Sequence, residues 1–257
     1  MTVKDAIAAL RRAHDELAGW AAGLSADQLR ARSGSADWNV AQVLSHLGSA
    51  AELGLGTLEA GRGDPERNQP VWDRWNAMSP EEQRSNFVES DARYVDALEA
   101  LSDDQLQSMR VDLGFLPEPV DLDFLLGMRI SEVALHGWDV AVSADPGAAL
   151  PPYLVPFVLA RIPTFAGYLA RPIERAGTVG VEIRDPAGWY HLEVRDDGGS
   201  LTEASGPARA GASTARMPAE AFIRLTAGRL SPEHTPEGVS VSGPIDLDDM
   251  RRIFPGY

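Results

Sequence analysis

The hydrophobic pattern of this chain changes its period once, and this change most constrains the fold. Before the turn-forming segment Asp145-Pro146-Gly147, apolar residues recur at spacings of three and four, the period of an amphipathic helix. After it, residues 179–183 alternate between apolar side chains and glycine or charge, as half-buried strands do. We therefore predict an α+β protein with a helical domain over residues 1–145 and a smaller α+β domain over residues 146–257.

Four segments of the first domain carry the helical pattern. They run from Val3 to Leu24, from Val40 to the glycine-rich stretch at 61–65, from Pro80 to Leu101, and from Leu122 to about Val142. Asn39 and Ser79 stand where N-caps are expected, and Ser79 is followed by proline and two acids. Four such helices predict a four-helix bundle, whose functional sites lie among inward side chains.

The second domain is predicted to mix helices and strands. We expect helices over Tyr153–Leu169, Pro218–Ala227 and Asp246–Ile253, a hairpin over 179–194 that turns at 185–188, and short strands at 212–215 and 239–241.

Composition excludes several classes of function. The formal net charge of −15 argues against nucleic-acid binding and against attachment to an anionic membrane, both of which need a surplus of Lys and Arg. The N-terminus has no apolar signal segment, and prolines interrupt the most apolar later stretch, residues 151–170. We expect a cytoplasmic monomer or small homo-oligomer that acts on a small molecule.

The chain contains no cysteine. Disulfides are therefore impossible, and any thiol chemistry would need a low-molecular-weight thiol that the protein binds.

Glu132 and His136 are candidate metal ligands. They are four residues apart, so on a helix both project from one face about one turn apart. A carboxylate oxygen and an imidazole nitrogen in this arrangement can bind one metal ion. The same spacing also occurs by chance on solvated helix faces, so the pair alone leaves both interpretations open.

His46 strengthens the metal interpretation. It has the spacing to share the inward face of its helix with Val43, Ala50 and Leu53, where a polar group needs a partner. That partner is either a neighbouring protein group or a metal ion shared with Glu132 and His136. Two histidines and one carboxylate suit Zn²⁺, with a fourth position left open as in catalytic sites.

Other polar residues have two interpretations each. We expect His14 to be a packed, hydrogen-bonded histidine instead of a pocket residue. Arg129, one turn before Glu132, could pair with a substrate or with Glu132, and we expect the structural ion pair. Asp139, three residues beyond His136, is either a hydrogen-bond acceptor for that histidine or an exposed charge. Trp38 and Trp138 are expected in the core or a pocket wall. His191 is expected to point to solvent and His234 to lie in a loop.

Residues 37–47, which end in Ser45-His46-Leu47, and residues 132–140, Glu132-Val-Ala-Leu-His136-Gly-Trp-Asp-Val140, resemble the two signatures of the mycothiol-dependent maleylpyruvate isomerase family. This family belongs to the DinB-like group of metal-binding four-helix bundles. Residues 217–229 and 239–243 are similar to its sterol-carrier-like C-terminal domain. The resemblance therefore covers nearly the whole chain.

The resemblance implies a divalent metal, expected to be Zn²⁺, on His46, Glu132 and His136, and mycothiol as the thiol cofactor. It also implies that Arg229 is a catalytic arginine that binds substrate carboxylates, with Arg224 as the nearby alternative.

The activity expected from the resemblance is a mycothiol-dependent, metal-assisted reaction of a small unsaturated acid. A thiolate adds to an electron-poor double bond; rotation and loss of the thiolate give cis–trans isomerisation, and loss of another group gives thiol S-transfer. The alternative is a non-catalytic small-molecule binding protein that retains the fold and the metal site.

Overall fold

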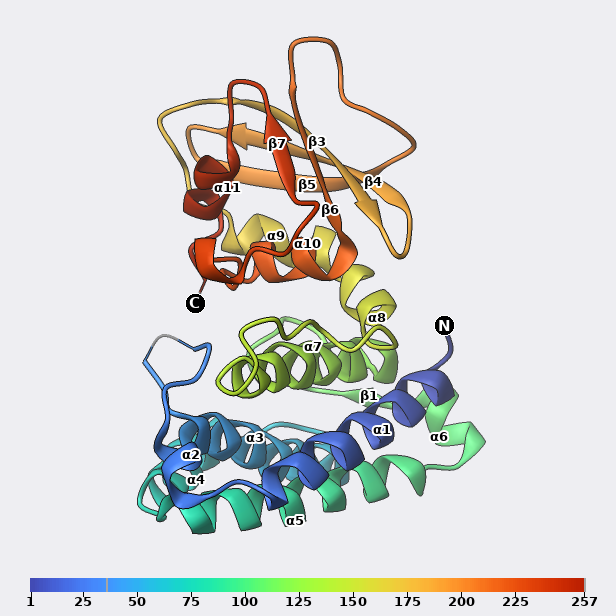
Figure 1. Ribbon diagram of the computed structural model, residues 1–257. Helices are drawn as coiled ribbons and strands as arrows, with labels where there is room; N and C mark the ends of the chain where they lie inside the picture. The colour runs from blue at the N-terminus through green and yellow to red at the C-terminus, as the bar shows by residue number, and fades with distance from the viewer. Residues whose placement is uncertain (36, 257) are drawn as a thin grey trace. The chain divides into compact units, whose positions relative to one another are not determined.

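The structure is a computed structural model that describes residues 1–35 and 37–256. It divides into two compact units, Met1–Asp145 and Pro146–Tyr257 (Figure 1). The first unit is helical and the second combines a sheet with helices, so the predicted α+β class is confirmed. In the part of the chain that is described, no helix is both long enough and apolar enough to cross a membrane.

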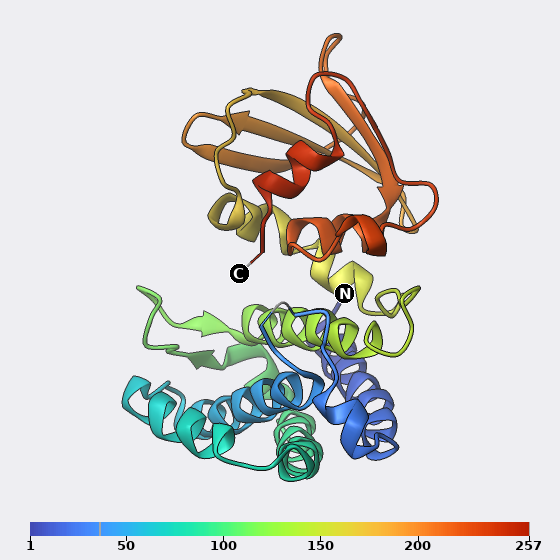
Figure 2. The same cartoon turned by 60° about the vertical axis from the view of Figure 1, so that its left-hand side comes forward.

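Four long helices form the core of the first unit. α1 packs against α5 and α7, and α3 packs against the same two helices, so the four close into a bundle (Figures 1 and 2). Shorter elements connect them. The bounds are α1 Val3–Ala22, α2 Ala26–Arg30, α3 Val40–Ala60, α4 Pro65–Asn76, α5 Pro80–Glu99, α6 Asp103–Ser108, β1 Arg110–Val111, β2 Val120–Asp121 and α7 Leu122–Ala141.

Local sequence signals explain where the bundle helices begin. Asn39 caps α3 and Ser79 caps α5, each through a reciprocal capping box with the residue three positions later. α3 ends at Gly61, which adopts the left-handed conformation (φ 69°) that ends many helices. These caps set the phase of α3, and therefore the direction in which His46 projects.

Close helix packing depends on Gly48 of α3. A Cβ atom built on Gly48 would lie 2.3 Å from the Trp75 ring and 3.0 Å from the Cα atom of Phe87 in α5. The Ser90 hydroxyl donates a 2.9 Å hydrogen bond to the Gly48 carbonyl. Any larger residue would separate α3 from α5.

The second unit is built on a five-stranded sheet with strand order β5-β4-β3-β6-β7. β3 and β6 are parallel, and the other neighbouring pairs are antiparallel. α9 and α10 cover one face of this sheet (Figures 1 and 2). The bounds are α8 Val155–Leu159, α9 Ile162–Leu169, β3 Gly177–Arg184, β4 Gly188–Arg195, β5 Gly198–Ala204, β6 Ser213–Pro218, α10 Ala219–Thr226, the 3₁₀ helix η1 Pro232–His234, β7 Ser240–Ser242 and α11 Leu247–Ile253.

Three details of the secondary structure differ from the sequence prediction. The helix predicted over Tyr153–Leu169 is broken into α8 and α9, because Pro163 lacks the N–H that a continuous helix would use and instead occupies the first turn of α9. α4 was not predicted, since Pro70 lies inside it. β5 was not predicted either, because its glycine-rich start hides the alternating pattern.

Candidate metal centre

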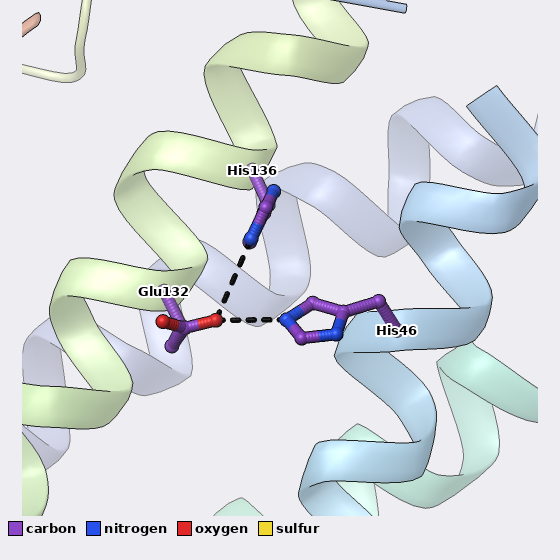
Figure 3. A group of neighbouring side chains, drawn as sticks. All are labelled: His46, Glu132 and His136. Atoms are coloured by element: carbon purple, nitrogen blue, oxygen red, sulfur yellow. Dashed lines mark hydrogen bonds and ion pairs between the residues drawn. The ribbon is translucent and has the colours of Figure 1, made fainter. Parts of the chain in front are cut away.

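His46, Glu132 and His136 come together between α3 and α7 (Figure 3). The Glu132 carboxylate lies between the two imidazoles: its Oε2 atom is 2.8 Å from His46 Nε2 and 3.5 Å from His136 Nε2. One potential ligand atom from each residue lies within 4.8 Å of the others. A single divalent ion could therefore contact all three side chains after small adjustments.

The cluster is open on one side. The His136 side chain is 4% exposed, whereas those of His46 and Glu132 are 32% and 34% exposed. His46 is therefore less buried than its place on the apolar stripe predicted, because its side chain also borders a cavity. This opening would let a small molecule reach the three donor atoms.

The histidines keep Glu132 ionised. Burial works to raise the pKa of this carboxyl, but hydrogen bonds and charge from His136 and His46 outweigh burial and lower the pKa well below its usual range. Glu132 is therefore a carboxylate at neutral pH, the form that binds a cation.

Asp139 fixes the orientation of the His136 ring. Its Oδ2 atom lies 2.8 Å from His136 Nδ1, and the residue is fully buried. A carboxylate here accepts a hydrogen bond from Nδ1–H. The proton therefore stays on Nδ1, and the lone pair of Nε2 is directed toward Glu132. Of the two interpretations of Asp139, the structure supports the hydrogen-bond acceptor and excludes the exposed charge.

We expect Asp139→Ala to weaken zinc binding by about 10- to 100-fold, because the His136 ring loses the group that sets its tautomer and orientation. Zinc affinity would be measured by competition with a chromogenic chelator. Asp123→Ala is the matched control, since it removes an exposed carboxylate from the same helix. Equal affinity in the Asp139 and Asp123 variants would show that Asp139 has no influence on the metal site.

Trp38 forms a wall beside the cluster. Its ring centroid lies 5.0 Å from that of His46 and 5.8 Å from that of His136. Trp138 is instead 2% exposed and belongs to the core. Trp38 also borders a cavity of about 290 Å³ between α3 and α4, which begins at His46.

A second polar cluster lies inside the bundle. Asp91 of α5 accepts a 2.5 Å hydrogen bond from Arg129 Nη2 and lies 2.8 Å from His14 Nδ1, and all three side chains are buried. His14 is thus a packed histidine as expected. Arg129 forms a structural ion pair, but its partner is Asp91 and not Glu132, because the Arg129 side chain is buried in the bundle interior, where Asp91 is also buried. The Arg129 guanidinium holds the pKa of Asp91 below its usual range, although burial alone would raise it.

The remaining candidates lie in the second unit. Arg229 is buried, and its Nη1 atom donates to the Ala227 carbonyl. Arg224 is also buried; it pairs with Glu220 at 2.7 Å and donates to the His234 carbonyl, which gives it a structural role. His234 ends the short 3₁₀ helix η1 instead of lying in an irregular loop.

The prediction that His191 points to solvent is wrong. His191 is half-buried, and its Nε2 atom lies 2.9 Å from the Gly206 carbonyl oxygen. The reason is tertiary: the segment after β5 crosses this face of the sheet, and a Cβ atom on the neighbouring Gly180 would come within 3.0 Å of Ala208.

Asp91 and the cavity-lining residues of α4 were not predicted from the sequence. Asp91 lies four residues after Phe87 and three before Tyr94, so its place on the apolar stripe of α5 was a usable signal. The cavity-lining residues of α4 were missed with that helix. Its start, Asp64-Pro65-Glu66, has the same cap, proline and acid pattern that identified α5.

Comparison with known proteins identifies the family and the fold. Residues 10–141 match the family model described as the mycothiol maleylpyruvate isomerase N-terminal domain. No curated protein matches the chain.

Two solved structures have a similar fold. The crystal structure of the mycothiol-dependent maleylpyruvate isomerase superposes with a TM-score of 0.68 at 16% identity, over 94% of this chain and 93% of that one. A mutant of that isomerase, with histidine replaced by alanine, gives a TM-score of 0.68 at 15% identity over the same shares. At these identities the likeness establishes the fold, and the family match covers just over half of the chain. The chain belongs to the mycothiol maleylpyruvate isomerase family.

Proposed function

We propose that this protein is a metal-assisted, mycothiol-dependent enzyme that acts on a small electrophilic substrate, an unsaturated carboxylic acid, by cis–trans isomerisation or thiol S-transfer. The observation that carries the proposal is the convergence of His46, Glu132 and His136 on one partly open point. Their donor set of two imidazole nitrogens and one carboxylate oxygen suits Zn²⁺ and leaves a position for an exogenous ligand.

The three ligands would hold the ion in the forms that the structure favours. Glu132 is ionised at neutral pH, and Asp139 favours the His136 tautomer with its proton on Nδ1, so that the Nε2 lone pair is directed at the ion. When bound, zinc would supply a Lewis acid that lowers the pKa of a thiol in the open position and raises the share of thiolate.

A bound thiol is needed because the chain has no cysteine of its own. The related crystal structure is of an enzyme described as mycothiol-dependent. Trp38, which packs against both histidine rings, would keep bulk water from one side of the reacting sulfur.

The test is turnover of maleylpyruvate by the zinc-loaded protein with no thiol, with mycothiol or with cysteine. We expect conversion only with a thiol, and a lower dissociation constant for mycothiol than for cysteine. Formation of the trans isomer would identify an isomerase, and a stable thiol product would identify a transferase. Equal conversion without thiol would contradict the proposal, and ligand binding without conversion would favour a binding protein.

Arg229 is proposed to contribute to turnover, on the similarity of its segment to the family's C-terminal domain. We expect Arg229→Ala to lower kcat/KM by at least about tenfold, because a planar guanidinium binds a carboxylate through two hydrogen bonds, while the zinc content stays unchanged. Arg216→Ala is the control, since Arg216 is an exposed arginine on β6 of the same unit. Unaltered kinetics of the Arg229 variant would remove it from the site.

A further inference from the structure

The cavity beside His46 has a lining unlike that of a site for a charged substrate. It lies between α3 and α4 in the first unit and measures about 290 Å³, the lower end of the range for small-molecule sites. The indoles of Trp38 and Trp72 both border it. Trp72 is 41% exposed, so part of its ring is accessible to a ligand in this cavity.

Neutral hydrogen-bonding groups supply the rest of the lining. Three side-chain amides, of Gln42, Gln69 and Asn76, and two hydroxyls, of Ser45 and Ser49, face this space. The Gln69 amide donates to Asp73 and the Ser49 hydroxyl to the His46 carbonyl.

Several lining groups remain available to a ligand. Over residues 1–35 and 37–256, the side chains of Ser45 and Asn76 and the indole N–H groups of Trp38 and Trp72 make no hydrogen bond to the protein. The hydroxyl and the amide can both donate and accept, and the indole N–H groups donate, which suits a hydroxyl-rich ligand.

The cavity beside His46 differs from the neighbouring cavity on the other side of α4 in the charge of its lining residues. No described residue that lines the cavity beside His46 is Asp, Glu, Lys or Arg. The neighbouring cavity of about 380 Å³ is lined by several arginines and glutamates, among them Arg67, Arg74 and Glu52. Apart from the ion proposed at its His46 end, this cavity offers a carboxylate no cationic side chain, whereas a neutral ligand would bind there without a desolvated charge.

We propose that the α3–α4 cavity binds an uncharged, polyhydroxylated ring system, with the C–H face of a ring stacked on Trp72 and its hydroxyls bonded to the neutral amides. Sugar and cyclitol rings have this chemistry: an apolar C–H face and a rim of hydroxyls that both donate and accept.

The proposal deepens the proposed function and rests on it for the natural ligand. Mycothiol carries its cysteinyl thiol on a glucosamine–inositol unit, which is neutral and rich in hydroxyls. His46 belongs to both the metal cluster and the cavity lining, so a thiol at the metal would place its attached rings at the mouth of this cavity. The cavity would then select mycothiol over small thiols.

The test is calorimetric titration of the full-length, zinc-loaded protein with three probes: mycothiol, N-acetylcysteine and the neutral N-acetylglucosaminyl-inositol, which lacks the cysteine. We expect Trp72→Ala to raise the mycothiol dissociation constant about tenfold and to leave that of N-acetylcysteine unchanged. Asn76→Ala, a milder change at the end of α4, should weaken mycothiol about fivefold. Arg67→Ala is the control, because it alters an exposed residue of α4 on the other cavity.

The outcomes separate this proposal from the proposed function. If Trp72→Ala and Asn76→Ala change no dissociation constant, or weaken N-acetylcysteine as much as mycothiol, the cavity does not bind the rings. If the wild type binds neither thiol, the proposed function fails. Binding of the thiol-free N-acetylglucosaminyl-inositol that is lost in Trp72→Ala would still support the cavity assignment.

Discussion

The protein with alanine in place of His46 is expected to lose its zinc, and turnover should fall with it. Groups that only orient a metal ligand commonly contribute 10- to 100-fold in affinity, so loss of one of three direct ligands should cost more than about 100-fold. Glu132→Ala and His136→Ala should have the same effect. His46 and Glu132 are each about one-third exposed, so these two truncations should disturb folding little.

Elemental analysis of protein purified without added metal would measure this effect. The wild type should hold about one divalent ion per chain. His191→Ala is the control, because it removes a half-buried histidine from the second unit and should leave occupancy intact. Addition of a chelator should lower the melting temperature of the wild type but not of the His46 variant, since only the former is stabilised by a bound ion. Full metal occupancy in His46→Ala would disprove the ligand assignment.

Asp91→Ala is expected to destabilise the protein by about 3–5 kcal/mol, because it leaves the Arg129 guanidinium buried without its counter-ion. Across the described residues, Nε and Nη1 of Arg129 already lack hydrogen-bond partners. The Leu47 carbonyl, 3.0 Å from Arg129 Nη2, and the Tyr94 ring, 5.9 Å from the guanidinium carbon, would be the compensation that remains. Urea unfolding would measure the loss.

Two further variants make this experiment decisive. Arg11→Ala removes an arginine whose exposed partners are Asp96 and Glu99, and it should cost about 1 kcal/mol or less. Replacing both buried partners, as Asp91→Leu with Arg129→Met, should restore most of the stability, since no unpaired charge remains. A loss for Asp91→Ala no larger than for Arg11→Ala would show that the buried pair is not needed.

The same pair predicts a pH dependence. The pKa of Asp91 is lower in the folded protein than its ordinary value of 3.8. A carboxyl with a depressed pKa stabilises the folded state fully above its unfolded pKa, and this contribution is lost as the pH falls toward the folded pKa. The stability difference between wild type and Asp91→Asn should therefore be constant near neutral pH and shrink below about pH 4.

Local signals in the sequence were enough to predict the bundle helices, including the two that carry the candidate metal ligands. The capping residues Asn39 and Ser79 lie at the starts of α3 and α5, where they were predicted. The four-residue spacing of Glu132 and His136 places both on one face of α7, since this follows from helix geometry alone. The alternation in residues 179–194 likewise predicted the β3–β4 hairpin.

Only the tertiary structure decided which distant residues meet. His46 reaches Glu132 across 86 positions of sequence, and Arg129 reaches Asp91 across 38, because the bundle helices close side by side. No local pattern encodes such a pairing, since it depends on helix packing and on close approaches such as the one at Gly48. The cavity beside His46 could not be predicted because α4 forms one of its walls. Pro70 disfavours a helix in this segment, and packing against α3 stabilises the helix despite it.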